Sequence, residues 1–500
     1  MTMFDFEGQA IECQENDSVA TALYRAGVRT FSRSFKFHRK RGLYCLTGDC
    51  PNCLMTIDGE PAVRACCTPA SEAREVRRGN AWPSAEHDVL SVLWHLRALL
   101  PVGFYYKSMI RPRWLWPRAE RVIRRIAGLG TVSRTAAPAR REQMNHHPDL
   151  LVIGGGLAGL AAALSAADRG ESVLLAEEGA IGEQFAPGAT RERVAAVHTQ
   201  LSRRRSVTGL QRATAVGIYQ GPLVPIVAKD FLHMVHPARI VVATGAVERH
   251  AVFPGSDLPG VWLGRGAARL AGIHGMMPGR RIVVVAAARE GLEHLETLRA
   301  QATRSGQSAV VAAVVPAVLA SKVPEGIEVI IDGVVRSVKG RGAVRAVVIG
   351  SPLGARTIAC DALVLSLGLQ PRDGLLRQAP GDPVQAAGEL LLPNCSSEVA
   401  EASGHEAVFA DRHAEPDPIE LPAAPSSGFV CLCEDVLVEE LDHAWHEGYR
   451  STELLKRYST TTMGACQGAL CHPQLRAFVC ARSPESRPAL PTTARPPARP

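Results

Sequence analysis

LLVIGGGLAG, residues 150–159, is the stretch that decides the fold of the central part of the chain. Its four apolar residues predict a buried strand, and Gly154, Gly156 and Gly159 follow with G-x-G-x-x-G spacing. In this pattern the first glycine allows a tight turn, the second lets a pyrophosphate approach the backbone, and the third lets a helix pack on the strand. The alanine-rich segment that follows predicts this helix, with its N-terminal amides directed at the phosphates. The stretch therefore predicts a Rossmann-like dinucleotide site.

An acidic residue at the end of the next predicted strand supports this interpretation. The strand Ser172–Ala176 ends at Glu177, about twenty residues after the glycines, where a carboxylate can hold a ribose hydroxyl. An acid at this place disfavours a 2′-phosphate. A later strand, Val241–Ala243, leads into Thr244-Gly245, a turn similar to one that lies beside the flavin in two-domain flavoproteins. The predicted cofactor-binding residues are Gly154, Gly156, Leu157, Ala158, Gly159, Glu177, Glu178, Gln184, Thr244 and Gly245.

The α/β pattern continues to about residue 392 and contains a second strand–turn–helix unit. Its strand, Arg281–Val285, leads into a turn over residues 286–291 that lacks the required glycines. This turn is interpreted as structural rather than as a nicotinamide nucleotide site. Further strands are predicted at Ile240–Ala243, Ala309–Val315 and Ala362–Ser366.

Upstream of this core, four cysteines have the spacing of a [2Fe–2S] ligand set. Cys45-x4-Cys50-x2-Cys53 places three thiols on one loop, and twelve residues separate Cys53 from Cys66. Plant-type ferredoxins hold their cluster with three thiolates on one loop and the fourth farther along the chain. Cys67 is a rival for the fourth position, but neighbouring residues of a strand point to opposite faces, and Cys66 is favoured. A zinc site and simple buried thiols are the alternatives.

A second cysteine set lies near the other end of the chain. It consists of Cys431-x-Cys433 and Cys466-x4-Cys471, with 32 residues and predicted helices between the pairs. The arrangement resembles the bacterioferritin-associated ferredoxin type of [2Fe–2S] domain, in which the last gap is commonly shorter. Zinc is the rival ligand here. The predicted metal ligands are thus Cys45, Cys50, Cys53, Cys66, Cys431, Cys433, Cys466 and Cys471.

The composition restricts the class of protein. The chain has 500 residues, 46% of them apolar, and a net charge of +7. No apolar run reaches the about 18 residues of a transmembrane helix, and the N-terminus lacks the regions of a secretory signal. We therefore expect a cytoplasmic location, which includes a peripheral position at the inner face of the membrane. In the reducing cytoplasm, clustered cysteines bind metals rather than form disulfides. Without a nucleic-acid-binding motif, the modest charge predicts no nucleic acid partner.

These patterns predict an α/β core of the two-dinucleotide-binding-domain flavoprotein type. A ferredoxin-like α+β domain precedes it, containing a helix at Val19–Ala26 and a hairpin around Asp58-Gly59, and a small helical [2Fe–2S] domain follows it. The predicted boundaries are 1–80 for the ferredoxin-like domain, 81–148 for a connecting segment that ends in a linker over 131–148, 149–392 for the dinucleotide-binding domain, 393–425 for a second linker, 426–480 for the cysteine domain and 481–500 for a disordered tail.

Two segments have unusual composition without a decisive motif. The connecting segment concentrates tryptophans and arginines between Trp82 and Trp116, which suits either packing on a neighbouring domain or a subunit interface. The run Arg33–Arg41, RSFKFHRKR, leads into the first cysteine loop. A solvated face, a contact with an acidic partner and a contact with a flavin phosphate are all compatible with this run.

Several stretches resemble the large (alpha) subunit of heteromeric sarcosine oxidase and its dehydrogenase relatives. They are FHRKRG at residues 37–42, NAWPS at 80–84, PVGFYYK at 101–107, ATGAVER at 243–249 and LPGV at 258–261. The relatives include hydrogen cyanide synthase, opine oxidases and proline or hydroxyproline dehydrogenases. The resemblance implies an adenine dinucleotide in this chain, a D-amino-acid-oxidase-like flavoprotein beta subunit that oxidises the amine, and an FMN at the subunit interface.

Differences from the sarcosine oxidase alpha subunits indicate which relatives this chain resembles most. Those alpha subunits lack the first cluster ligands and carry a long C-terminal folate-binding domain, whereas this chain keeps all four thiols and ends at residue 500. This favours the dehydrogenase relatives, with electrons leaving through [2Fe–2S] centres to a quinone or a carrier. Two-domain flavoproteins often carry a Gly-Asp pair near the flavin, and residues 393–412 do not contain it. FAD is still favoured over NAD.

The expected function is therefore electron transfer within an oxidoreductase acting on CH–NH or CH–NH2 donors, with a substrate of the sarcosine, proline, hydroxyproline, opine or glycine type oxidised in the partner. No constellation of catalytic side chains is apparent in this chain, since the cofactors supply the chemistry. The alternatives are an NAD(P)H-dependent, ferredoxin-reductase-like electron transferase and a zinc-bound scaffold without enzymatic activity.

Overall fold

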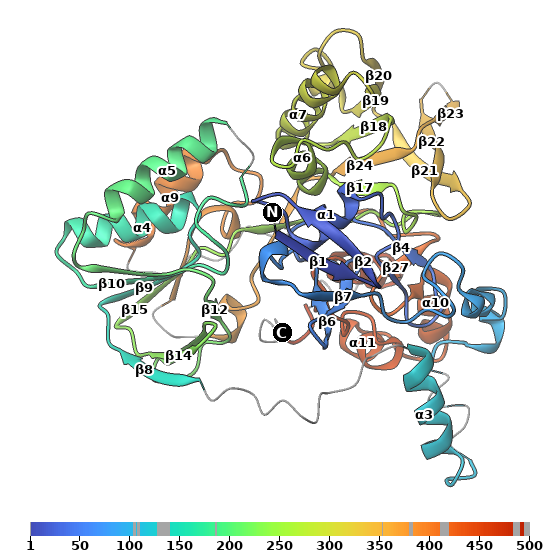
Figure 1. The fold of residues 1–500 in the computed structure, drawn as a ribbon, viewed down its shortest axis with the longest axis horizontal. Helices are drawn as coiled ribbons and strands as arrows, with labels where there is room; N and C mark the ends of the chain where they lie inside the picture. Colours follow the sequence, from blue (N-terminus) through green and yellow to red (C-terminus); the bar gives the residue numbers. More distant parts are fainter. Residues whose placement is uncertain are drawn as a thin grey trace.

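The structure is a computed structural model that consists of several folded units (Figure 1). It describes residues 2–103, 107, 111–127, 141–185, 188–352, 354–379, 384–410, 420–483 and 491–494. Parts of the predicted linkers and tail, at 131–140, 411–419, 484–490 and 495–500, lie outside the described residues.

The N-terminal unit is a five-stranded sheet with the predicted helix near residues 19–26. The strand order is β2-β1-β7-β5-β6, and the predicted hairpin is present with Asp58 and Gly59 at positive φ in its turn. Helix α1 begins after the capping box of Ser18 and Thr21. The elements are β1 Thr2–Phe6, β2 Gln9–Cys13, α1 Val19–Arg25, β3 Ser32–Arg33, β4 Lys40–Arg41, β5 Leu54–Ile57, β6 Glu60–Arg64 and β7 Glu75–Arg77.

The first dinucleotide unit contains the glycine-rich stretch in the middle of a parallel sheet. The strand order β11-β10-β9-β15-β26 places the fully buried β9 between β10 and β15. Because a parallel sheet is covered on both faces, its strands are almost wholly apolar. The elements are β9 Leu150–Ile153, α4 Leu157–Asp168, β10 Val173–Ala176, α5 Ala189–Leu201, β11 Val207–Leu210, β15 Arg239–Val242, β26 Val384–Ala386 and α9 Ser397–Ala407.

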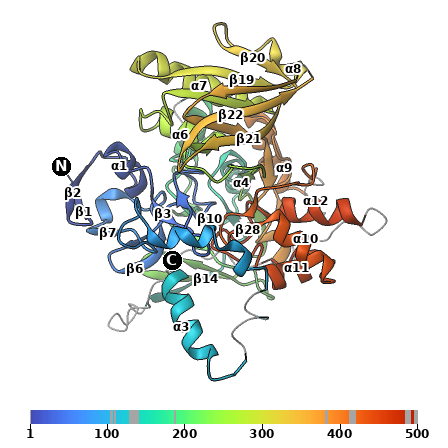
Figure 2. The ribbon, with the colours of Figure 1, turned by 90° about the vertical axis from the view of Figure 1, so that its right-hand side faces the viewer.

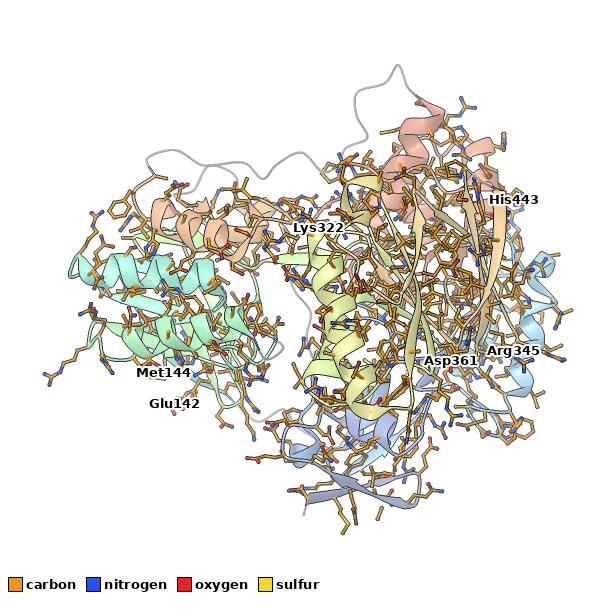
Figure 3. All side chains as sticks on the ribbon, turned by 90° about the horizontal axis from the view of Figure 1, so that it is seen from above. Glu142, Met144, Lys322, Arg345, Asp361 and His443 are labelled. Atoms are coloured by element: carbon orange, nitrogen blue, oxygen red, sulfur yellow. The ribbon has the colours of Figure 1, made fainter. Side chains whose placement is uncertain are left out.

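A small second sheet, in the order β12-β13-β14-β8, completes this unit. Its strands are β12 Thr214–Ala215, β13 Val224–Val227, β14 Phe231–Val235 and β8 Glu142–His146. Seen from above, Glu142 and Met144 of β8 lie in one lobe, and Arg345 and Asp361 lie in the other (Figure 3).

The second dinucleotide unit repeats the parallel architecture. Its sheet has the order β17-β24-β18-β19-β20 and is flanked by a three-stranded antiparallel sheet. Two short strands, β16 Ala246–Glu248 and β25 Leu369–Pro371, pair antiparallel where the chain crosses between the two units. The elements are β17 Val261–Leu263, α6 Gly264–Gly272, β18 Arg281–Ala286, α7 Arg289–Ser305, β19 Ala309–Val315, α8 Ala317–Ala320, β20 Glu328–Ile331, β21 Val334–Gly340, β22 Val344–Ser351, β23 Gly354–Ala359 and β24 Ala362–Ser366.

The C-terminal unit is small and mostly helical. Its own core surrounds Leu441, Leu455 and Phe478, which are fully buried. Figure 2 shows it beside the second dinucleotide unit. The elements are β27 Phe429–Cys431, β28 Val436–Leu437, α10 Val438–His446, α11 Thr452–Ser459 and α12 His472–Arg482.

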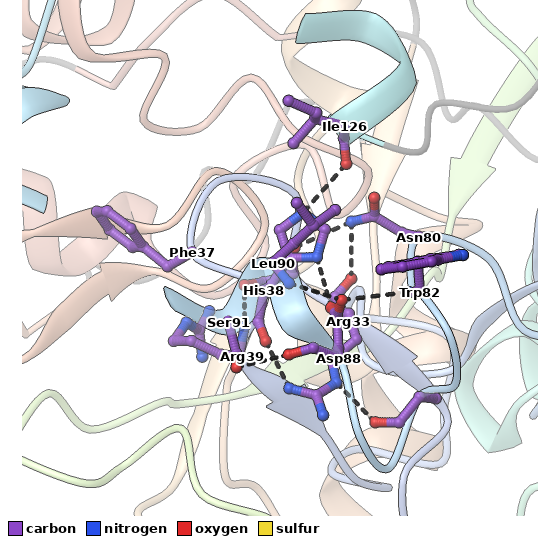
Figure 4. A network of polar contacts seen from close by, with 12 residues as sticks. Arg33, Phe37, His38, Arg39, Asn80, Trp82, Asp88, Leu90, Ser91 and Ile126 are labelled. Atoms are coloured by element: carbon purple, nitrogen blue, oxygen red, sulfur yellow. Dashed lines mark hydrogen bonds and ion pairs between the residues drawn. The ribbon is translucent and has the colours of Figure 1, made fainter. Parts of the chain in front are cut away.

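The connecting segment is fastened to the N-terminal unit by a buried polar network (Figure 4). His38 Nδ1 lies 2.6 Å from Asp88 Oδ2, and its Nε2 lies 3.1 Å from the Ile126 carbonyl. Arg33 Nε donates to the Ala85 carbonyl at 2.7 Å. Beyond this anchor, helix α3, Trp116–Ala127, projects from the molecule in both views (Figures 1 and 2).

Three segments differ from the sequence predictions. Within the predicted linker 131–148, residues 142–146 form strand β8, because their backbone pairs with β14. Within the predicted linker 393–425, Ser396 caps helix α9, which packs on α4. Within the predicted disordered tail, Thr492 is buried, and its N–H donates to His472 Nε2 at 3.0 Å.

A buried aspartate joins the N-terminal and C-terminal units. Asp435 is fully buried and accepts from the backbone N–H groups of Lys36 and Phe37 at 3.1 and 3.0 Å and from Arg39 Nε at 2.9 Å. Arg39 also contacts Asp257 at 3.0 Å, which adds a loop of the second dinucleotide unit. We call these contacts the Asp435 clasp. The run Arg33–Arg41 is therefore a buried internal contact rather than a solvated face.

We expect Asp435→Ala to destabilise the protein by about 3–5 kcal/mol, because removing one partner of a buried ion pair leaves an uncompensated charge. Differential scanning calorimetry should show the transition of the C-terminal unit at lower temperature. The matched control is Asp442→Ala, which removes a half-exposed partner of Arg482 in the same unit and should cost about 1 kcal/mol or less. Equal effects of the two substitutions would contradict the role of the clasp.

Candidate cofactor sites

The first cysteine set converges in a buried space beneath the loop between β4 and β5. Cys45, Cys50, Cys53 and Cys66 are all buried, and the Sγ atoms of Cys45 and Cys50 are 3.2 Å apart. Hydrogen bonding to Cys45 raises the pKa values of Cys50 and Cys66 well above that of an ordinary thiol. Four thiols that share one buried space can ionise together only around a cation, which suits a metal cluster.

The neighbouring Cys67 lies outside this space. It is exposed, whereas Cys66 is only 9% exposed. The Cys66 thiol interacts with Cys45, Cys53 and Cys67, and its Sγ lies 3.7 Å from Cys67 Sγ. Burial favours Cys66 over Cys67 as the fourth ligand, which stays a prediction.

The second cysteine set converges in the same way. Cys431, Cys433, Cys466 and Cys471 are buried, and the N–H of Cys466 lies 3.5 Å from Cys433 Sγ. Hydrogen bonds to Cys431 and Cys466 raise the pKa values of Cys433 and Cys471. A Cβ on Gly464 would lie 2.2 Å from Cys433 Cβ, so this glycine is required for the loops to approach each other.

The number of converging thiols is the same in both sets. Structural zinc is held by four ligands around one ion. In a [2Fe–2S] cluster four thiolates are shared between two irons. Each set of four thiols supplies the number of ligands that either centre requires.

The glycine-rich loop has the close approaches that a dinucleotide site needs. Gly154 has a φ of +115°, and a Cβ there would lie 2.2 Å from the Ala243 carbonyl oxygen. A Cβ on Gly159 would lie 1.8 Å from the Gly154 carbonyl oxygen, whereas a Cβ on Gly156 would meet nothing within 4 Å. The first and third glycines thus serve packing, and Gly156 borders open space at the N-terminus of α4, where a pyrophosphate can approach.

The other predicted dinucleotide residues are distributed around this loop. Glu177 accepts from the Gly155 N–H at 2.5 Å and from the Gly179 N–H at 3.1 Å. Leu157 and Ala158 are buried in the first turn of α4, and they can offer a ligand only backbone N–H groups. Glu178 and Gln184 are half-buried on the chain that follows β10.

The predicted flavin turn is joined to a residue that the sequence analysis did not single out. Thr244 Oγ1 donates to the Arg372 carbonyl, and the Arg372 N–H donates to the Gly245 carbonyl, both at 3.0 Å. The Arg372 guanidinium lies 2.8 Å from Asp49, which belongs to the first cysteine loop. Its charge also acts on Glu178. Arg372 thus connects the dinucleotide site to the first cysteine set.

A glycine–acid pair, Gly388-Glu389, precedes residues 393–412, where the Gly-Asp pair of two-domain flavoproteins was expected. Gly388-Glu389 follows β26 after one residue, and a Cβ on Gly388 would lie 2.7 Å from Ala158 Cβ in the first turn of α4. The signal in the sequence was the dipeptide itself at the end of a strand. The pair could not be recognised from the sequence, because β26 is short and the pair ends in glutamate rather than aspartate.

The fold and these sites define an iron–sulfur flavoprotein with two dinucleotide-binding units. Residues 1–81 match the 2Fe-2S iron-sulfur cluster binding domain, residues 148–392 the pyridine nucleotide-disulphide oxidoreductase domain, and residues 425–500 the sarcosine oxidase A3 domain. The predicted fold class is confirmed, and so are a [2Fe–2S] cluster and FAD as cofactors.

Two sarcosine oxidase alpha subunits are similar to this chain over most of its length. The sarcosine oxidase alpha subunit of Rhizobium meliloti (strain 1021) is 31% identical over 93% of this chain and 53% of its own length. That of Corynebacterium sp. (strain U-96) is 26% identical over 92% and 51%. The chain spans about half the length of these relatives. The chain is similar to sarcosine oxidase alpha subunits over almost its whole length, and the predicted resemblance is confirmed.

A solved structure shares the whole architecture. The crystal structure of L-proline dehydrogenase from P. horikoshii superposes with a TM-score of 0.67 at 19% identity, covering 100% of this chain and 96% of that one. At this identity the likeness concerns the fold. In the described part of the chain, no helix is long and apolar enough to cross a bilayer.

We expect Gly156→Ala to weaken FAD binding by about tenfold or more, which is a loss of about 1.4 kcal/mol, while the apoprotein keeps its stability within about 1 kcal/mol. The reason is that the added Cβ meets no protein atom but narrows the approach to the backbone. Flavin titration by fluorescence and calorimetry of the apoprotein measure the two effects. Gly159→Ala is the matched control and should lower both properties. Unchanged flavin affinity in Gly156→Ala would contradict this site.

We expect Cys66→Ser to lower the iron content by about two atoms per chain and Cys67→Ser to leave it unchanged. The adjacent pair differs in burial but not in chemistry. In the second set, Cys471→Ser should have the same effect as Cys66→Ser, with Cys480→Ser as its control. Colorimetric iron analysis and EPR of the reduced protein are the measurements. Iron loss in Cys67→Ser but not in Cys66→Ser would reverse the ligand assignment.

Proposed function

We propose that this chain is the electron-transfer subunit of a heteromeric, flavin-dependent amine or imino-acid dehydrogenase or oxidase. The observation that carries the proposal is the Arg372 junction, where one side chain contacts the first cysteine loop at 2.8 Å while its backbone holds the Thr244-Gly245 turn. A residue shared by a predicted flavin site and a predicted one-electron centre supports electron transfer between them. The similarity to sarcosine oxidase alpha subunits supports the same role.

The chain's residues would position the cofactors rather than react themselves. FAD, when bound, accepts an electron pair and releases the electrons singly. Glu177 and the α4 amides would orient the adenosine end, and the Arg372–Asp49 pair would hold the first thiol loop against the flavin turn. The second thiol set would hold a second [2Fe–2S] cluster, in series with the first.

The amine would be oxidised in a partner. We propose a D-amino-acid-oxidase-like beta subunit, with an FMN at the interface, and a substrate of the sarcosine, proline, hydroxyproline, opine or glycine type. The connecting segment supports a partner contact because Trp82 and Trp114 are 66% and 63% exposed, and tryptophan and arginine are enriched at interfaces. Electrons would leave to a quinone or a carrier, in the cytoplasm or at the inner face of the membrane.

One contact argues against the NAD(P)H-dependent alternative. Glu290 lies in the first turn of α7, where a second pyrophosphate would bind, and its carboxylate contacts Arg265 Nε at 2.6 Å. Burial raises the pKa of Glu290, but Arg265 outweighs burial and keeps the pKa below its usual value. The Glu290 carboxylate thus already occupies, as an anion, the helix N-terminus that a second pyrophosphate would use.

The test is anaerobic reduction of the chain together with its partner subunit. We expect a matching amine, offered from a panel of sarcosine, L-proline, hydroxyproline, octopine and glycine, to bleach the flavin and to produce the EPR signal of a reduced [2Fe–2S] cluster. NADH should produce neither. Reduction of the cluster by NADH in the absence of a partner would favour the electron transferase instead.

A variant addresses the junction itself. Arg372→Gln should keep its FAD and iron but slow the appearance of the cluster signal by about tenfold or more, since misplacement of about 1 Å can cost 10²-fold in rate. Arg356→Gln, which removes an exposed arginine of β23, is the control. Freeze-quench EPR after mixing with the amine measures the rate. Equal rates in the two variants would exclude a role for the junction.

A further inference from the structure

Two arginines, Arg39 and Arg41, contact the loop of the second cysteine set. Arg41, on strand β4, is 5% exposed, and its Nη2 donates to the carbonyls of Leu432 and Cys433 at 2.7 and 3.0 Å. These carbonyls belong to the loop that carries the first two thiols of the second set. On its own chain, Arg41 stands four residues before Cys45, the first thiol of the first set. Arg41 therefore belongs to the segment that leads into the first set and is bound directly to the loop of the second set.

Among the described residues, no carboxylate forms a direct ion pair with Arg41. Its neighbour Arg39 makes the direct contacts with Asp435 and Asp257 instead. Burial lowers the pKa of Arg41, while Asp435 and, more weakly, Cys433 and Cys50 oppose this effect. Arg41 thus lies within electrostatic range of one cysteine from each set.

A second contact connects the same two regions without adding charge. The hydroxyl of Tyr44, next to Cys45, lies 2.6 Å from His250 Nδ1. Gln474, in the helix that follows Cys471, donates to the His250 carbonyl at 2.5 Å. This connection fixes the distance between the sets, so that a change of charge at Arg41 need not change their separation.

We infer that Arg41 is a positioning residue that directs an electron from the first cysteine set to the second, because its fixed positive charge stabilises the added electron more strongly on the set whose loop it binds directly. The inference rests on the proposed function, in which both sets hold clusters. One electron leaves the first centre, which is oxidised, and arrives at the second, which is reduced. No bond forms or breaks, and no proton or further reactant takes part.

Arginine suits this position for a physical reason. A guanidinium stays protonated when buried and presents several N–H donors in a fixed plane, which allows two carbonyl contacts at once. A unit charge a few ångströms away also interacts more strongly at the low effective dielectric constant of a buried site than in water. Removing this charge should therefore affect the second centre more than the first.

The experiment is an EPR-monitored redox titration of the full chain loaded with both clusters. In Arg41→Gln we expect the ratio of reduced second centre to reduced first centre, at a fixed potential, to fall on the order of tenfold, which is 59 mV for a one-electron couple. Arg41→Lys keeps the charge and should stay within about twofold of the wild type. Lys40→Gln removes the adjacent charge, whose side chain approaches Gly342 instead, and should cause no change.

The outcomes separate this inference from the proposed function. A wild-type chain with only one EPR signal would refute the second cluster and hence the proposed series. Two signals with an unchanged ratio in Arg41→Gln would refute the role of Arg41 alone. If Arg41→Gln does not hold both clusters, Arg41→Lys decides, since a tenfold shift in a variant that keeps the charge would also refute it.

Discussion

A buried carboxylate that needs several donors determines how the units of this protein meet. Asp435 lies in the loop that follows Cys433, and it accepts from two backbone N–H groups and from Arg39. A charge in this environment is tolerable only if it is paired and hydrogen-bonded. The partners are about 400 positions away in the sequence, so satisfying Asp435 brings the two ends of the chain together. Both cysteine sets and Arg41 depend on this contact for their relative positions.

The dinucleotide site depends on a similar long-range closure, made with small residues instead of charges. Helix α4 approaches the loop closely because Gly159 has no side chain, and α9 approaches α4 closely because a Cβ on Gly404 would lie 2.0 Å from the Ala158 carbonyl oxygen. Gly388 makes a third such approach. The N-terminus of α4 is therefore enclosed by residues more than 200 positions downstream, and the glycine motif is only one side of the site.

The sequence could predict what is encoded locally. Cysteine spacing, the G-x-G-x-x-G loop and the Asp58-Gly59 turn each specify geometry over a few residues, and the hairpin and the parallel strands are present as expected. Strand β8 was missed because its polar residues show no strand pattern, and pairing with β14 alone defines it. The role of the run Arg33–Arg41 could not be predicted, because no motif in the sequence identifies Asp435 as its partner. Arg372 was missed because its role depends on contact with Asp49, 323 positions away.

The two junctions of the proposed relay have a common design. Arg372 connects the dinucleotide site to the first cysteine set, and Arg41 connects the segment that leads into the first set to the loop of the second. Each centre becomes more negative when it receives an electron, so a cation at each boundary favours passage toward the next. Arginine does not release its proton at physiological pH, unlike histidine, so it can provide this charge without coupling electron movement to a proton. His250, which contacts Tyr44 next to Cys45, is kept neutral, because burial lowers its pKa to about 4. In the proposed function, the chain would thus provide permanent charges along the electron route and leave proton chemistry to the partner.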